Sequence, residues 1–241
     1  MRILGIIPAR FASTRFPGKP LAMIGNQSMI ERVVEQARKA SKLDAVLVAT
    51  DDARIYDHVH SFGAEAVMTS PDHQSGTERC LEAALRLSGT IDAVINIQGD
   101  EPFIQASQID AVAGLIDEGA EIATLARRMN YKLASDPNKV KVVCDKNGKA
   151  LYFSRSPIPH HRDGANENEE FLKHLGIYGY RFGSLQHIAQ LKPTPLELAE
   201  KLEQLRWLES GYSIHVAETD YESPAIDTPE DLKEVLQNMG L

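Results

Sequence analysis

The sequence is poor in features that mark several common classes of protein. Only two of its 241 residues are cysteines, Cys80 and Cys144, and neither belongs to a Cys-x-x-Cys pair, which excludes a disulfide framework. Its longest apolar runs, such as residues 3–7, have the length of a strand and fall far short of the ~20 residues of a membrane-spanning helix. The N-terminus also lacks the apolar core of a secretory signal. We therefore expect a cytoplasmic protein with reduced thiols and no membrane partner.

Positive charge is in deficit. The chain has 26 Lys and Arg residues against 34 Asp and Glu residues, a formal net charge of −8. A nucleic-acid partner is not expected, because binding a polyanion normally requires a basic surface. The segment from Arg10 to Lys19 is nevertheless locally basic, with three cations and no carboxylate. This distribution favours a small anionic ligand over a polymer.

Three familiar nucleotide-related motifs are missing as well. No G-x-G-x-x-G occurs, which disfavours a nicotinamide-binding Rossmann site, and Gly18-Lys19 is followed by Pro20 and so does not form a Walker loop. A glycosyltransferase on a related sheet would be expected to carry a D-x-D metal motif, and none is found. The ligand site must therefore be sought from the order of strands and helices.

Short apolar strands alternate with amphipathic helices through the first half of the chain. Strands are predicted over 3–7, 45–49, 65–68, 93–97 and 122–126, and helices over 28–40, 53–61, 77–87 and 106–117. This alternation indicates βαβ units and a mostly parallel α/β sheet with helices on both faces. Such sheets bind ligands beyond the carboxyl ends of their strands.

The pattern changes after about Ser135. A β-hairpin is predicted around Asn147-Gly148, followed by an exposed polar loop over 157–170. Further elements are predicted at 176–180 (strand), 196–209 (helix), 214–217 (strand) and 229–237 (helix). We interpret the chain as one domain, 1–241, with an insertion of about 135–212 on the sheet edge.

The loop after the first strand, residues 8–20, is the first candidate site. It joins a strand to a helix, where backbone N–H groups and the helix dipole favour anions. Arg10, Arg15 and Lys19, with the hydroxyls of Ser13 and Thr14, suit a chain of phosphates. A merely solvated loop is the less favoured alternative.

Two carboxylates are candidate Mg²⁺ ligands. Asp100 follows a buried strand in Asn96-Ile97-Gln98-Gly99-Asp100, where a carboxylate can hold Mg²⁺ jointly with nucleotide phosphates. Asp227 precedes Thr228-Pro229, which is a good start for a helix. Spacing alone leaves the role of Asp227 open between metal ligand and helix start.

The segment 71–79 opens the helix after the third strand. Its polar donors and acceptors suit a base edge, and its Thr77 and Gly76 equally suit a helix cap with a tight turn. Both roles can hold together.

Seven segments together resemble the 3-deoxy-manno-octulosonate (Kdo) cytidylyltransferase family, also called CMP-Kdo synthetases. They are PARFASTRFPGKPL, DHQSGTER, INIQGDEPF, LYFSRSPIP, KHLGIYGYR, LEQLRWLE and IDTPEDL, in order from the first strand to the last helix. The resemblance implies a glycosyltransferase-A-like, Rossmann-related nucleotidyltransferase fold and a cytoplasmic homodimer. It also implies CTP and Kdo as substrates, Mg²⁺ as cofactor, and a place in lipopolysaccharide biosynthesis.

The resemblance also assigns site residues. It implies catalytic roles for Arg10, Lys19, Asp100 and Asp227, with Asp100 and Asp227 as the Mg²⁺ ligands. The implied nucleotide-binding residues are Pro8, Ala9, Arg10, Arg15, Lys19, Gln74, Ser75, Gly76 and Arg79. The implied sugar-binding residues are Gln98, Arg155, His174, Tyr178, Glu203 and Gln204.

The sugar set has an independent chemical rationale. An acid sugar presents a carboxylate and many hydroxyls, which call for an Arg and a ring of His, Tyr, Glu and Gln side chains. Strand packing is the alternative for His174 and Tyr178, which stand at i and i+4 of one strand. Glu203 and Gln204 are adjacent on a predicted helix and so point about 100° apart. Rival functions are a cytidylyltransferase for another acid sugar (8-amino-Kdo or a sialic acid), a glycosyltransferase, or a nucleotide sensor.

Overall fold

The computed structural model describes residues 1–13, 15–162, 169–224 and 226–238. Thr14 and residues 163–168 of the polar loop expected over 157–170 lie outside the described residues. The strands are β1 (Ile3–Ala9), β2 (Met23–Ile24), β3 (Gln27–Ser28), β4 (Ala45–Thr50), β5 (Glu65–Met68), β6 (Ala93–Asn96), β7 (Ile122–Asn130), β8 (Lys141–Cys144), β9 (Ala150–Ser154), β10 (Glu170–Arg181) and β11 (Ile214–Glu218). The helices are η1 (Lys19–Leu21, a 3-10 turn), α1 (Met29–Ala37), α2 (Ala53–Ser61), α3 (Gly76–Leu85), α4 (Ala106–Asp117), α5 (Tyr131–Ala134), α6 (Phe182–Ile188), α7 (Pro195–Glu200), α8 (Glu203–Glu209) and α9 (Pro229–Asn238).

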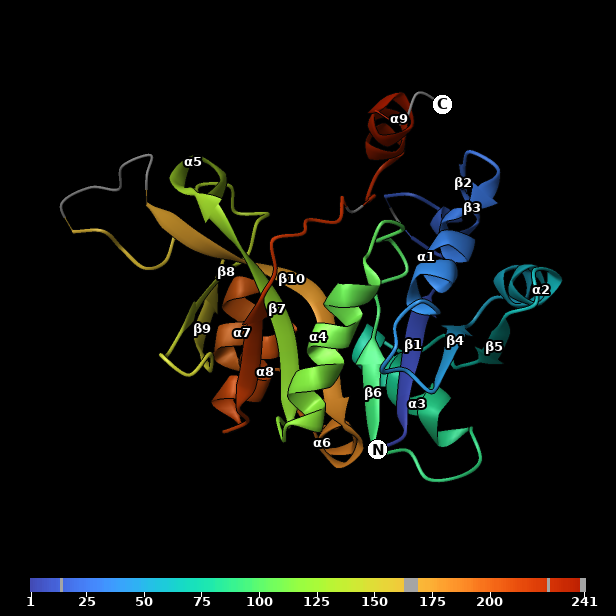
Figure 1. The fold of residues 1–241 in the computed structure, drawn as a ribbon, viewed down its shortest axis with the longest axis horizontal. Helices are drawn as coiled ribbons and strands as arrows, with labels where there is room; N and C mark the ends of the chain where they lie inside the picture. Colours follow the sequence, from blue (N-terminus) through green and yellow to red (C-terminus); the bar gives the residue numbers. More distant parts are fainter. Residues whose placement is uncertain (14, 163–168, 225, 239–241) are drawn as a thin grey trace.

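One twisted sheet forms the centre of the molecule (Figure 1). Its main strand order is β11-β7-β10-β6-β1-β4-β5, and the hairpin β8–β9 pairs onto β10. The strands β4, β5 and β6 run parallel to β1, and β11 runs parallel to β7. The predicted α/β class with a mostly parallel sheet is confirmed.

Helices cover both faces of this sheet because its central strands are apolar on both sides. In β1, Ile3 and Ile7 pack with α1, α2 and α4, whereas Leu4 and Ile6 pack with α3, α6 and α8. All four of these side chains are buried. Burial on both faces is the arrangement that parallel sheets require, and it leaves the strand ends as the place for polar residues.

The insertion departs from the prediction in one respect. Its hairpin β8–β9 lies off the main strand path, as expected, but its long strand β10 lies inside the sheet, antiparallel to both β6 and β7. A bulge between Leu175 and Tyr178 shifts the register against β7. The residues around His174, which belong to β10, therefore lie inside the sheet and not at its edge. This position brings them close to the end of β6.

The helix predicted over 196–209 is in fact two helices. Lys201 has φ 54°, a left-handed conformation that ends α7. The carboxylate of Glu200 accepts hydrogen bonds from Ser154 Oγ at 2.6 Å and Arg155 N at 2.9 Å. These tertiary bonds hold the end of α7 against β9, so α8 begins anew at Glu203.

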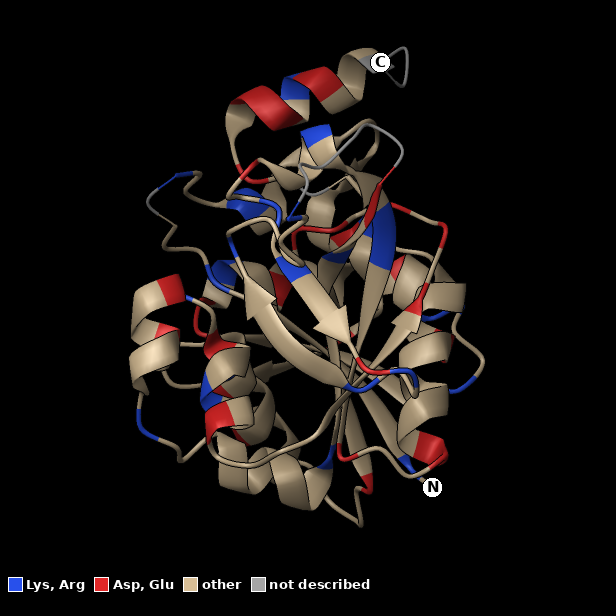
Figure 2. Ribbon diagram, turned by 90° about the vertical axis from the view of Figure 1, so that its left-hand side faces the viewer, with Lys and Arg blue, Asp and Glu red and all other residues tan. Residues whose placement is uncertain are grey.

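The C-terminal helix α9 lies at one end of the molecule, beyond the sheet, with acidic and basic residues side by side along it (Figures 1 and 2). Val235 of α9 and Ile226 before it pack with Ile24 and Met29. The connection from β11 to α9 thus crosses the end of the sheet. None of the helices in the described ranges is long and apolar enough to cross a membrane.

Candidate active site

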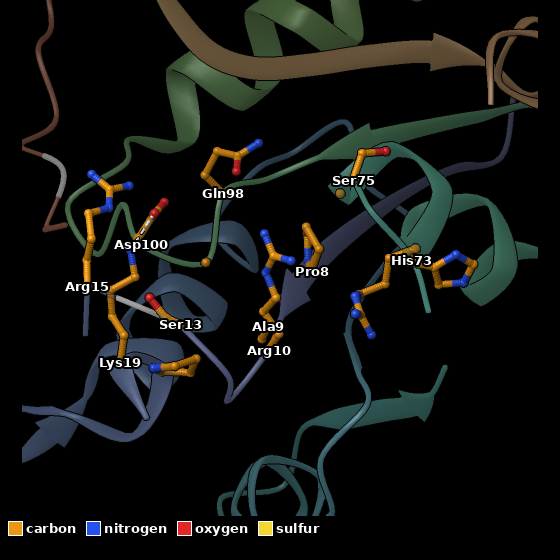
Figure 3. A pocket seen from close by; sticks show the side chains of 14 residues that line it. Pro8, Ala9, Arg10, Ser13, Arg15, Lys19, His73, Ser75, Gln98 and Asp100 are labelled. Atoms are coloured by element: carbon orange, nitrogen blue, oxygen red, sulfur yellow. Dashed lines mark hydrogen bonds and ion pairs between the residues drawn. The ribbon is translucent and has the colours of Figure 1, made fainter. Parts of the chain in front are cut away.

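A pocket of about 210 Å³ lies beyond the carboxyl ends of β1 and β6 (Figure 3). This is the edge that the parallel strand order predicts. The pocket is lined by Pro8, Ala9, Arg10, Ser13, Arg15, Lys19, Pro20, His73, Ser75, Gly76, Arg79, Gln98, Gly99 and Asp100. It therefore brings together three segments that are far apart in the sequence: the loop after β1, the start of α3 and the end of β6.

The loop after β1 is folded tightly on Phe11. The carbonyl of Phe11 accepts hydrogen bonds from Ser13 N and Gly18 N, both at 3.0 Å. Gly18 has φ 70°, and a Cβ there would lie only 3.0 Å from the Phe11 ring. The guanidinium of Arg54 covers that ring, 3.3 Å from its centroid. These contacts hold the loop's cations over the pocket.

Two carboxylates converge on one ammonium group. Lys19 Nζ donates to Asp100 Oδ2 at 2.7 Å and to Asp227 Oδ1 at 3.3 Å. The guanidinium of Arg15 donates to both oxygens of Asp227, at 3.1 and 3.2 Å. The Asp227 carboxylate is thus paired with Lys19 and Arg15 and does not cap the following helix. At the start of α9 it is Asp231 Oδ2 that accepts a hydrogen bond from Thr228 N, at 2.8 Å. The two predicted acidic residues therefore meet in space.

This pair of carboxylates fits a Mg²⁺ ion shared with phosphates. Mg²⁺ is usually held by one or two carboxylates, with phosphates and water as its other ligands. Among the described residues no group of three or more His, Cys, Asp or Glu residues could hold a metal alone. The site thus has the donor set of a metal bound together with a nucleotide, and not that of a closed structural site.

The start of α3 forms the opposite wall. Ser75 caps the helix, accepting from Glu78 N at 3.2 Å. Arg79 is buried, and its guanidinium donates to Asp51 at 3.0 Å and to Thr69 at 2.6 Å. Its charge is thus fixed within the fold at the edge of the pocket. Gln74 lies apart from the pocket lining: it is exposed, and its amide donates to Asp72 O at 2.7 Å.

His73 lines the pocket and is absent from the residues assigned by resemblance. Its Nε2 contacts the carboxylate of Glu82, and its Nδ1 lies 3.6 Å from Glu78 Oε2. Glu82 is also bonded to Ser70 N and Arg86. The sequence analysis included His73 only as a member of the segment 71–79 proposed for a base edge, and gave it no role of its own.

Of the proposed sugar residues, all of which lie within the described ranges, Gln98 alone is in the pocket lining. Gln98, in the pocket wall, donates to Gly176 O at 3.1 Å. His174 and Tyr178 are neighbours, with ring centroids 5.3 Å apart, and the Tyr178 hydroxyl is buried without a hydrogen-bond partner. A buried hydroxyl without a partner is costly, which is consistent with a polar ligand nearby.

Glu203 reaches the same region from α8. Its Oε2 accepts from Thr77 Oγ1 at 3.0 Å, two residues from Ser75. Burial raises the pKa of Glu203, opposed by the hydrogen bond from Thr77. Gln204, the next residue, is buried at 5% exposure within the α8 packing. The two adjacent side chains therefore lie in different surroundings, as their helical spacing indicates.

The guanidinium of Arg155 is engaged by backbone carbonyls. It donates to Glu200 O at 2.7 Å, Pro137 O at 3.1 Å and Lys201 O at 3.3 Å. In this structure Arg155 joins β9 to the end of α7 and to the loop before β8. A sugar-binding role for Arg155 requires these bonds to be exchanged for bonds to the ligand.

Burial raises the cost of ionisation at two side chains near the site, Glu101 and His174. The Glu101 carboxyl has its pKa raised to about 7, first by burial and second by the negative charge of Asp100. His174 shows the opposite behaviour: burial lowers the pKa of its imidazole to about 3. His174 is therefore neutral at physiological pH, which makes it a hydrogen-bonding group and not a cation.

We expect His174 to make folding pH-dependent. Between pH 7 and pH 5 the unfolded imidazole takes up a proton and the folded one does not, so the free energy of unfolding should fall by about 2 kcal/mol more with His174 than without it. His174→Gln should remove this difference while keeping a partner for Thr124 Oγ1, which lies 3.0 Å from His174 Nε2. Urea unfolding of the wild type and the variant at pH 7 and pH 5 measures the free energy of unfolding. An equal change between the two pH values in both proteins would contradict the prediction.

Comparison with known proteins agrees with this geometry. A cytidylyltransferase family profile matches residues 4–215. Proteins called 3-deoxy-manno-octulosonate cytidylyltransferase from Cytophaga hutchinsonii and Bacteroides thetaiotaomicron are each 52% identical, covering 97% of this chain and 96% of their own length. A CMP:2-keto-3-deoxy-manno-octonic acid synthetase solved with CTP is 41% identical, with a TM-score of 0.94, covering 100% of this chain and 99% of its own. The pocket at the strand ends, the acidic pair and these full-length likenesses lead to one conclusion: this chain belongs to the cytidylyltransferase family.

Proposed function

We propose that this protein is a 3-deoxy-manno-octulosonate cytidylyltransferase, which converts CTP and Kdo to CMP-Kdo and pyrophosphate for lipopolysaccharide biosynthesis. The observation that carries the proposal is that Asp100 and Asp227 both pair with Lys19, which lines a pocket together with Arg10 and Arg15. A nucleotide and a metal need this combination of charges. The full-length likeness to Kdo cytidylyltransferases supports Kdo as the sugar.

The reaction joins two substrates in one displacement. The anomeric hydroxyl oxygen of Kdo forms a bond to the α-phosphorus of CTP, the bond from that phosphorus to the bridging oxygen breaks, and pyrophosphate leaves. The hydroxyl proton passes to water or to a carboxylate of the site. Such phosphoryl chemistry depends mainly on positioning and on charge stabilisation.

The cations of the loop after β1 carry the charge stabilisation. Arg10 and Lys19 line the pocket together with Arg15, and in this proposal all three neutralise the triphosphate and the departing pyrophosphate. Lys19 now neutralises the two carboxylates, and incoming phosphates offer its ammonium group a second partner. Arg and Lys divide this work, since Arg binds two oxygens at once and Lys acts as a mobile point charge.

Mg²⁺ is the cofactor of this proposal, with Asp100 and Asp227 as its protein ligands. When bound, the ion withdraws charge from the phosphate oxygens and lowers the pKa of the attacking hydroxyl. Asp100 is positioned by the end of β6, whereas Asp227 is delivered by the connection before α9. The two ligands are thus held by separate elements.

The remaining walls recognise the base and the sugar. Pro8, Ala9, Ser75, Gly76 and Arg79 line the cytosine side, and Gln74 reaches it only by leaving Asp72. In this proposal Gln98, His174, Tyr178, Glu203, Arg155 and Gln204 form the polar surroundings of Kdo. The hydroxyls of Kdo match these donors and acceptors.

Pyrophosphate release with CTP and Mg²⁺ tests the proposal, with Kdo, 8-amino-Kdo and N-acetylneuraminate compared as sugars. We expect release with Kdo. Release with another of the three alone would keep the chemistry and change the sugar assignment. No release with any sugar, although CTP binds, would favour a nucleotide sensor or a glycosyltransferase.

Two further proposals concern assembly and location. The insertion exposes Leu151 of β9 and Leu198 of α7, at 61% and 54% exposure, and within the described residues β9 pairs in the sheet with β8 alone. Exposed apolar side chains beside a free strand edge favour self-association, so we propose a homodimer through this face. We also propose the cytoplasm as its location, consistent with the two free thiols Cys80 and Cys144.

The dimer makes a prediction of its own. Leu198→Asp should shift the chain from dimer to monomer in sedimentation equilibrium, because it places a charge in a buried apolar contact. Leu85→Asp is the matched control, since Leu85 is similarly exposed, at 58%, on α3 outside the insertion. A wild-type monomer, or equal effects of the two substitutions, would overturn the proposal.

A further inference from the structure

The second acidic residue of the site depends on an irregular segment for its position. Asp100 directly follows the end of β6, but Asp227 lies in the connection between β11 and α9, residues 219–228, of which Ala225 is outside the described residues. Figure 1 shows the described parts of this connection passing across the end of the sheet between β11 and α9. Its path decides whether the Asp227 carboxylate meets Asp100.

One buried amide from α4 holds the middle of the connection. Gln108 is only 2% exposed. Its Nε2 donates to Tyr221 O at 3.3 Å, and its Oε1 accepts from Ser223 Oγ at 3.1 Å. A glutamine is suited to this position because one side chain supplies both a donor and an acceptor.

Ion pairs and a backbone bond fix the connection on either side of this point. The Glu222 carboxylate accepts from Lys173 Nζ at 2.6 Å and also contacts Arg127. Ile226 N donates to Asp100 O at 3.1 Å. This bond brings the backbone just before Asp227 against the backbone of Asp100. The connection is therefore attached to β7, β10, α4 and the end of β6, and Gln108 supplies the attachment from α4 through a buried side chain.

We propose that Gln108 is a positioning residue for the metal site: its amide holds the 219–228 connection so that Asp227 lies within reach of the ion that Asp100 binds. The inference rests on the metal role of Asp227 in the proposed function. Groups that orient metal ligands without touching the metal typically change metal affinity or activity by about 10- to 100-fold when they are replaced.

A purely structural role for Gln108 is the alternative. Its Oε1 also accepts from Gln105 N at 3.0 Å and so helps to start α4. Gln108→Glu separates the two roles, because a carboxylate keeps the acceptor for Gln105 N and Ser223 Oγ but has no donor for Tyr221 O. Ser223→Ala removes a contact to the connection from the other side and leaves Gln108 and α4 intact.

The test is CTP binding by titration calorimetry without sugar, so that no turnover occurs, in Mg²⁺ and in EDTA. We expect Gln108→Glu to weaken CTP binding about tenfold in Mg²⁺ and to leave it nearly unchanged in EDTA. Ser223→Ala should act in the same direction with a smaller effect. Ile55→Val is the matched control: it trims a fully buried side chain of α2, lowers the thermal midpoint, and should not alter CTP binding in either buffer.

Asp227→Asn separates this inference from the function on which it rests. If Asp227→Asn leaves the Mg²⁺ effect on CTP binding intact, the metal role of Asp227 is wrong and the inference fails with it. If Asp227→Asn removes the Mg²⁺ effect but Gln108→Glu and Ser223→Ala do not reduce it, the inference alone is overturned. Support also requires that the double variant bind CTP in Mg²⁺ as weakly as Asp227→Asn alone, with no further loss of affinity from Gln108→Glu.

Discussion

Asp100→Asn is expected to lower kcat for CMP-Kdo formation about a thousandfold, because it removes a carboxylate ligand where charge develops in the displacement. An amide of the same shape keeps the packing at the end of β6 and can still accept a hydrogen bond from Lys19. The loss should therefore fall on the chemical step and on Mg²⁺ dependence, not on folding. Pyrophosphate release under saturating CTP and Kdo measures it.

Asp117→Asn is the matched control for this substitution. Asp117 is an exposed residue of α4 that pairs only loosely with Lys42, at 3.8 Å, and its replacement should leave kcat unchanged. Both variants should bind CTP in EDTA as the wild type does. Activity of Asp100→Asn within a few fold of wild type would remove Asp100 from the metal site.

Gly99→Ala is expected to lower kcat/KM about a hundredfold, since displacements near 1 Å in a reacting geometry have effects of that size. A Cβ on Gly99 would lie 2.9 Å from the carbonyl oxygen of Pro8. The oxygen belongs to the backbone and the Cβ is attached directly to it, where β1 and β6 end side by side. Relief of the contact therefore requires the two strand ends to separate. Overpacking of this kind also costs about 1–3 kcal/mol of stability, which thermal unfolding would detect.

Gly183→Ala provides the comparison for Gly99→Ala. A Cβ on Gly183 meets no atom within 4 Å, and its φ is not in the left-handed region. Because Gly183 lies in α6, alanine there should leave activity unchanged and keep or slightly raise the thermal midpoint. Equal activities of the two alanine variants would show that the approach of Gly99 to Pro8 has no bearing on the pocket.

The regular elements were accessible from sequence because local patterns determine them. Strand β4 and helices α2 and α4 begin where the apolar periodicity predicts, since each buries its apolar residues against the sheet. Pairings between segments that are distant in the sequence produce no local pattern that could predict them. Nothing local to β10 indicates that it enters the sheet between β6 and β7, and the break at Lys201 depends on Glu200 being held by β9.

The candidate site follows the same division. Arg10, Lys19 and Asp100 could be proposed from their places at strand ends, because parallel strands bring those ends to one edge of the sheet. Asp227 could not, since its capping sequence permits either role and its partner Asp100 lies far away in the chain. His73 was included only as part of the segment 71–79, because its contact with Glu82 has no sequence signature. Gln108 was not found, because its proposed role depends on contacts with the 219–228 connection that no sequence pattern shows.

The central claim is that this pocket transfers a cytidylyl group from CTP to the anomeric hydroxyl of Kdo. ³¹P nuclear magnetic resonance of the protein with CTP, Mg²⁺ and Kdo tests it most directly, because it observes both products. The account predicts one new phosphodiester signal that grows in step with pyrophosphate and is absent without the sugar. Release of pyrophosphate with CMP and no phosphodiester, or CTP that stays intact beside Kdo, would contradict it.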